Sequence, residues 1–169
     1  MPKIPSAMSD IEEQSWLVRI EAKFKRAIDI KMPKTIDLAR QLAKKYPGPY
    51  DINQICAIYE YLVAQWKYVD DPRGIEYIAP ASISAKNLAG NCEDFAALMA
   101  ALIESIGGQS RILIASSQKE WHAYTEVFME HDCIWLNLDW TAHHAGGPLF
   151  KGTLERVIYP GLSIPLTHP

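Results

Sequence analysis

A cysteine at the start of an apolar helical run is the first feature that could carry chemistry. Cys92 stands in GNCEDFAALMAALIESIGG, residues 90–108, after a glycine and an asparagine and directly before two acids. A thiol attacks as the thiolate, and a helix start supplies partial positive charge and free N–H groups that favour this anion. Most free cysteines are small buried apolar residues, so a candidate nucleophile needs further partners.

His122 and Asp139 are the partners that such a cysteine would need. His122 lies in WHAYTEV, where strand alternation puts it on one face with Tyr124 and Glu126. Asp139 ends WLNLD, and pairing of these two runs through the short EHD turn would make Asp139 a cross-strand neighbour of His122. An aspartate there can accept the imidazole N–H, fix the tautomer and stabilise the imidazolium. The three residues therefore fit a nucleophile, a base and an orienting acid.

Other reactive residue types have simpler interpretations. The patterns indicate packing roles for Cys56 and Cys133, structural acids in the first helical turn at Glu93 and Asp94, and an exposed loop pair at His143 and His144. Three scattered cysteines without a CxxC pair predict neither a disulfide framework nor a zinc ribbon, and free thiols fit a reducing compartment. A cysteine, a histidine and an aspartate could together bind zinc, but their pattern fits nucleophilic catalysis better. We expect no metal and no cofactor.

Helices come first in the chain and strands follow. Caps and apolar periods predict helices over 9–29, 35–46, 51–68 and 92–106, and alternation predicts antiparallel strands over 110–116, 121–129 and 133–139. The connection over 69–91 is too long for a simple turn and is a candidate cleft wall. The sequence therefore predicts an α+β fold in which a central helix, starting at Cys92, packs on an antiparallel sheet.

Size and composition narrow the function classes. A chain of 169 residues predicts a single domain, divided into a helical N-terminal extension (1–50), a core (51–159) and an extended tail (160–169). A net charge of −3 without a basic block argues against nucleic-acid binding, and no apolar run is long enough for a membrane span. The first residues, MPKIPSAMSD, lack the apolar region of a secretory signal, so we expect a cytoplasmic protein.

Three blocks in order resemble the transglutaminase-like superfamily: GNCEDFAALMAALIESIGGQSRILIA, WHAYTEVF and WLNLDWT. The similarity runs from about Trp66 to Thr141, and WKYVDDPRG also looks like the approach to the family's cleft. The resemblance implies a papain-like fold with Cys92 as nucleophile, His122 as base and Asp139 as orienting acid. Trp140 stands where the family often has proline, and nothing resembles the calcium sites of the large animal enzymes.

Attack on the amide carbonyl of a protein or peptide is the reaction that this resemblance implies, through a thioester intermediate. Water as acceptor would make the chain a peptidase or amidase, and a lysine amine would make it a transglutaminase. Similarity to small members without calcium sites favours hydrolysis. The oxyanion would be held by the Cys92 amide and one further donor, for which Trp66 and Tyr68 stay open. A non-catalytic peptide-binding module is the alternative from another class, and the oligomeric state is open.

Overall fold

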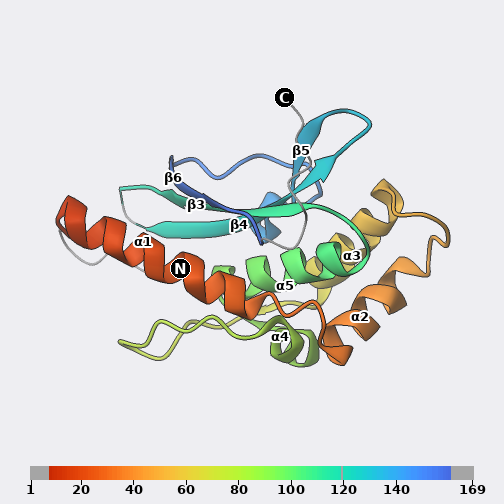
Figure 1. Ribbon diagram of the computed structural model, residues 1–169, viewed down its shortest axis with the longest axis horizontal. Helices are drawn as coiled ribbons and strands as arrows, with labels where there is room; N and C mark the ends of the chain where they lie inside the picture. Colours follow the sequence, from red (N-terminus) through yellow and green to blue (C-terminus); the bar gives the residue numbers. More distant parts are fainter. Residues whose placement is uncertain (1–7, 119, 161–169) are drawn as a thin grey trace.

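The computed structural model describes residues 8–118 and 120–160 (Figure 1). The elements in chain order are α1 (Asp10–Ala27), α2 (Pro33–Ala43), α3 (Ile52–Gln65), β1 (Lys67–Tyr68), α4 (Ala81–Asn87), β2 (Ala89–Gly90), α5 (Cys92–Ser105), β3 (Ser110–Ser116), β4 (Trp121–Met129), β5 (Ile134–Asn137), a short 3-10 turn (Trp140–Ala142) and β6 (Thr153–Ile158). Figure 1 shows the sheet as one layer, α5 beneath it, and α4 below α5. The expected α+β class is confirmed.

Helices α1 and α3 begin where their caps predict, whereas α2 begins at Pro33, two residues before the predicted start. Ser9 and Glu12 form a capping box at the start of α1, and the side chain of Asp51 accepts hydrogen bonds from two amides at the start of α3. α1 buries residues at helical spacing, among them Leu17 and Phe24. These residues belong to the same buried core as α5, so the first helix contributes to the core that surrounds α5.

One antiparallel sheet with the strand order β5-β4-β3-β6 lies over α5. Its strands β3 and β4 match the predicted ranges, whereas β5 is shorter than predicted and β6 was not predicted. The face that carries Ile114, Ala123 and Val127 packs in the core with α5. Leu113 and Tyr124 point to the opposite face, as alternation requires.

α5 is buried on nearly every side. Every residue from Cys92 to Ile103 is buried, and the side chain of Thr125 in β4 donates a 2.8 Å hydrogen bond to the carbonyl of Ala96. A helix apolar all round must lie inside a domain, so α5 is the fixed element on which the sheet and the other helices pack.

The connection over 69–91 is more ordered than the sequence indicates. It contains α4, and its end forms β2, which pairs in parallel with β1 so that Tyr68 lies opposite Gly90. Cys133, expected to pack in a strand, is instead exposed in the turn before β5 with φ 52°. Of the predicted tail 160–169, residues 161–169 lie outside the described residues. Within the described ranges, no helix is long and apolar enough to cross a membrane.

Candidate active site

The N-terminus of α5 is held by a reciprocal cap. Asn91 Oδ1 accepts from the amides of Glu93 at 3.0 Å and Asp94 at 3.2 Å. In return, Asp94 Oδ2 accepts from the Asn91 amide at 3.0 Å. Gly90 precedes the cap with φ 154°, and a Cβ there would collide with the Asp94 carboxylate. The cap uses the amides at 91, 93 and 94, so the Cys92 amide stays outside this network.

The segment before α4 is tied to the same turn of helix. The other oxygen of Asp94, Oδ1, accepts a 2.8 Å hydrogen bond from the amide of Ala79. The Val69 amide donates to the carbonyl of Gly90 at 2.9 Å. The connection over 69–91 therefore runs beside the first turn of α5, and its role as a cleft wall stays a prediction.

His122 and Asp139 lie in direct contact. The distance from His122 Nε2 to Asp139 Oδ2 is 2.7 Å, and both residues are 1 % exposed. Thr141 donates to the same carboxylate oxygen at 2.7 Å, and Tyr59 of α3 donates a 2.6 Å hydrogen bond to the Asp139 carbonyl. The Asp139 amide donates to Asn137 Oδ1 at 3.0 Å. The carboxylate is therefore fixed from several elements at once.

The contact between these two side chains is diagonal across the strands. The register sets Glu126 opposite Asn137, so Asp139 lies level with Tyr124 and reaches His122 one pleat further along the same face. β5 has ended by this point, which leaves the edge of β4 at Ala123 free for other partners.

The second imidazole nitrogen, Nδ1 of His122, is buried and has no hydrogen-bond partner among the described residues. The ring is packed between Phe150, with centroids 4.7 Å apart, and Tyr124, at 5.8 Å. Because Asp139 occupies Nε2, Nδ1 is the nitrogen available for a proton from another group.

Cys92 lies beside the same stretch of β4, since its sulfur accepts a hydrogen bond from the backbone of Ala123. The residue is 1 % exposed. Burial, followed by the charge of Glu93, raises the pKa of the Cys92 thiol to about 12, although the Ala123 hydrogen bond acts in the opposite direction. The direction is opposite to the lowering expected from the helix start, because burial penalises the thiolate.

The two oxyanion candidates occupy different settings. Trp66 packs edge-on against Phe95 with centroids 5.3 Å apart, and its buried Nε1 has no hydrogen-bond partner in the described part of the chain. Tyr68 donates a 2.8 Å hydrogen bond to Asp70, and its ring stacks on Trp140 at 5.7 Å. Burial raises the pKa of Tyr68, and the Asp70 hydrogen bond and nearby Cys92 add to this. Which of the two donates to an oxyanion stays a prediction.

The remaining candidates lie away from this cluster or in solvent. Cys56 is half-buried in α3, and burial raises the pKa of its thiol. His143 and His144 are exposed, as the sequence indicates. Sequence reasoning missed Tyr59 and Thr141 as partners of the carboxylate. The Asp-x-Thr spacing typical of side-chain turns could have identified Thr141, whereas no local pattern indicates Tyr59.

Structural comparison supports the same fold. A candidate cysteine protease from Cytophaga hutchinsonii superposes with a TM-score of 0.62 and 20 % identity over 78 % of this chain and 43 % of its own. A candidate protease from Parabacteroides distasonis gives a TM-score of 0.55 and 8 % identity, over 81 % of this chain and 30 % of its own. The present chain thus spans less than half the length of either protein. No curated protein sequence matches it.

Sequence comparison defines the family. The transglutaminase-like superfamily model matches residues 36–140, more than half of the chain, from α2 to the residue after Asp139. The matched region contains the N-terminus of α5, the start of β4 and the segment after β5, which carry Cys92, His122 and Asp139. The chain therefore belongs to the transglutaminase-like superfamily, a family of cysteine-dependent enzymes.

Proposed function

We propose that this protein hydrolyses an amide bond of a protein or peptide, with Cys92 as nucleophile, His122 as base and Asp139 as the acid that orients the base. The observation that carries the proposal is the hydrogen bonding of the two nitrogens of the His122 imidazole. Its Nε2 contacts Asp139 at 2.7 Å, while its Nδ1 has no hydrogen-bond partner among the described residues. The Cys92 sulfur bonds to the backbone of Ala123, the next residue in β4. This arrangement fits a thiol that transfers its proton to Nδ1.

The reaction would then proceed in balanced steps. The proton of Cys92 moves to His122 Nδ1, and the thiolate sulfur adds to the amide carbonyl carbon. The carbonyl oxygen becomes an oxyanion, to which the Cys92 amide, outside the capping network, can donate. The C–N bond breaks, and the imidazolium gives its proton to the departing amine, which leaves a thioester. Water then adds to the thioester carbon with His122 as base, releasing the carboxylate product and the thiol.

The burial of the sulfur sets a condition on this mechanism. Cys92 and His122 are both 1 % exposed, so a substrate can reach the sulfur only after the surrounding side chains rearrange. In the buried state the neutral thiol of Cys92 is favoured, because burial penalises the thiolate. Substrate binding and proton transfer are thus expected to occur together.

An activity-based thiol probe combined with a peptide library tests the proposal. The probe should modify Cys92, and the library should yield products with new carboxylates, each made by one bond cleavage and one water. Cys92→Ala should abolish both signals, and Cys133→Ala is the matched control that should leave both unchanged. Isopeptide-linked products would instead identify a transglutaminase. Absence of any product with wild-type protein, together with peptide binding, would contradict catalysis and favour a peptide-binding module.

A further inference from the structure

A group of carboxylates lies next to the proposed nucleophile and has no role in the mechanism above. Its members are Asp71 and Glu76, from the loop after β1, and Glu93 and Asp94, from the first turn of α5. We call them the acidic cluster. Burial is the largest cause that raises the pKa of Glu93, and the charges of Glu76, Asp71 and Asp94 come next, so all three lie close enough to act on it.

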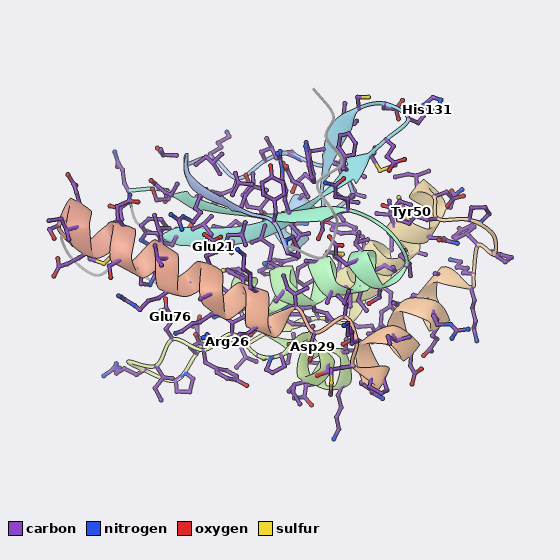
Figure 2. The ribbon with its side chains drawn as sticks, in the orientation of Figure 1. Glu21, Arg26, Asp29, Tyr50, Glu76 and His131 are labelled. Carbon is purple, nitrogen blue, oxygen red and sulfur yellow. The ribbon has the colours of Figure 1, made fainter. Side chains whose placement is uncertain are left out.

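Two members of the acidic cluster have carboxylates that are hydrogen-bonded or ion-paired to other groups of the protein. Glu76 accepts a 2.6 Å hydrogen bond from Trp16 Nε1, and its other oxygen lies 3.5 Å from the ammonium of Lys23. Figure 2 shows Glu76 on the side of its loop that faces α1, the helix that carries both partners. Asp94 is bound by the amides of Asn91 and Ala79. These two carboxylates therefore serve the structure.

The Glu93 carboxylate, in contrast, has an oxygen atom without a hydrogen-bond partner among the described residues. It is 3 % exposed, and its Oε2 atom is buried without a hydrogen-bond partner among the described residues. A buried carboxylate oxygen without a partner is costly, and native proteins usually supply a donor from the chain, a solvent molecule or a ligand. Asp71 next to it is only half-buried and accepts one hydrogen bond, from the amide of Tyr77 at 3.1 Å. The unpartnered Glu93 oxygen and the half-buried Asp71 carboxylate are therefore the two places in the acidic cluster where an added donor could bind.

The position of Glu93 gives such a donor a direct connection to the reaction. Glu93 follows Cys92 in the chain. Burial favours its protonated form, and its ionised form opposes formation of the thiolate. A cation bound at Glu93 would favour the ionised carboxylate and at the same time offset its charge, so that binding would not oppose the thiolate. The acidic cluster could therefore select a cationic substrate without hindering its attack.

We propose that Asp71 and Glu93 bind a positively charged group of the substrate, a lysine or arginine side chain next to the amide that Cys92 attacks. This inference rests on the proposed function, because it takes Cys92 as the nucleophile. It makes Glu93 a specificity-determining residue and assigns Glu76 and Asp94 to the support of the loop and the helix start.

Charged thiol reagents test the inference without requiring turnover. Methanethiosulfonates that carry either a trimethylammonium or a sulfonate group modify Cys92, and the rate at this residue is followed by mass spectrometry of its peptide. The ratio of the two rates is divided by the same ratio for N-acetylcysteine amide, so that access to the sulfur and intrinsic reactivity cancel. EDTA is present throughout, which prevents a metal ion from acting as the cation.

The expected normalised ratio is about tenfold in favour of the cationic reagent, as one ion pair at partial screening would give. Glu93→Gln and Asp71→Asn should each lower the ratio toward one, and Glu60→Gln, which removes an exposed charge on α3, should leave it unchanged. Asp71→Asn lies in a half-exposed loop, so it provides the test even if Glu93→Gln fails to fold. A ratio near one in the wild type, or a high ratio that persists in both variants, would overturn the inference.

The same data separate this inference from the proposed function. If Cys92 reacts faster than the exposed Cys133 but without charge preference, catalysis by Cys92 stands and the cation site fails. If Cys92 reacts no faster than Cys133 with any reagent, the nucleophile assignment fails. With peptide substrates, replacing a lysine next to the cleaved amide by norleucine should raise KM for wild type and have little effect on Glu93→Gln.

Discussion

The Nε2 atom of His122 lies 2.7 Å from Oδ2 of Asp139, and both side chains are removed from solvent. This contact joins the start of β4 to the segment after β5, and the hydroxyl of Thr141 binds the same carboxylate oxygen. The aspartate thus fixes the direction of the ring and, in the proposed mechanism, leaves Nδ1 to accept the proton.

Asp139→Asn tests the orienting role of the carboxylate. The amide keeps the shape but can present its NH₂ group to the ring, which favours the wrong tautomer, so kcat should fall by about 10²-fold or more with little change in KM. Steady-state kinetics with a cleaved peptide measures this. Asp132→Asn, in an exposed turn, is the matched control and should leave kcat and KM unchanged. A loss confined to KM would argue that Asp139 serves binding instead.

Glu93 should make stability depend on pH. Burial, followed by the charges of Glu76 and Asp71, raises the pKa of Glu93 from 4.5 to about 8. The folded state therefore favours the protonated form, and the stability that Glu93 contributes is present below about pH 4.5 and is lost as pH rises through about 8. Glu93→Gln should remove this part of the dependence. Thermal melts of both proteins from acid to mildly alkaline pH measure it, and parallel curves would contradict the raised pKa.

Gly90→Ala should destabilise the protein more than an alanine at another left-handed glycine. Gly90 has φ 154° and its new Cβ would collide with Asp94, whereas a Cβ added at Gly107, at φ 96°, would meet no heavy atom within 4 Å. Both variants carry backbone strain of about 1–2 kcal/mol, and only Gly90→Ala adds the collision. Urea unfolding gives both free energies of unfolding. Equal losses would mean that the Asp94 cap can move aside freely.

Tyr59→Phe should weaken the support of Asp139. Its buried hydroxyl donates a 2.6 Å hydrogen bond to the Asp139 carbonyl, and its loss leaves that acceptor unsatisfied at a cost of about 1–3 kcal/mol. The variant should unfold at lower urea concentration and show reduced kcat. Tyr46→Phe, in an exposed position, provides the comparison. Unchanged kcat in a destabilised Tyr59→Phe would show that this hydrogen bond supports only the fold.

Local signals predicted much of the fold. The capping box of Ser9 and Glu12, the cap at Asp51 and the alternation around His122 each appear in the structure at the expected positions. β6 was not predictable, because its polar side chains find partners only in the folded chain: Glu155 accepts from Ser116, and Arg156 contacts Glu21 at 2.7 Å. Edge strands of this kind carry little apolar pattern of their own.

The contact between His122 and Asp139 was predictable, and the environment of the candidate site was not. Sequence order and strand alternation placed these two residues together, and in the structure their side chains lie within hydrogen-bond distance. The burial of Cys92 depends on residues from several elements that no spacing rule connects, so its raised pKa could not be foreseen. For the same reason, the unpartnered oxygen of Glu93 could not be predicted from the sequence.

Site-resolved alkylation tests the central claim most directly, because exposure and catalysis predict opposite orders of reactivity. Cys133 is exposed and Cys92 is 1 % exposed, so accessibility alone would make Cys133 react first. If His122 accepts the thiol proton, iodoacetamide at about pH 6 should label Cys92 much faster than Cys56 or Cys133, and His122→Ala should remove the difference. Slow labelling of Cys92, unaffected by His122→Ala, would show that this sulfur is a packing atom and not a nucleophile.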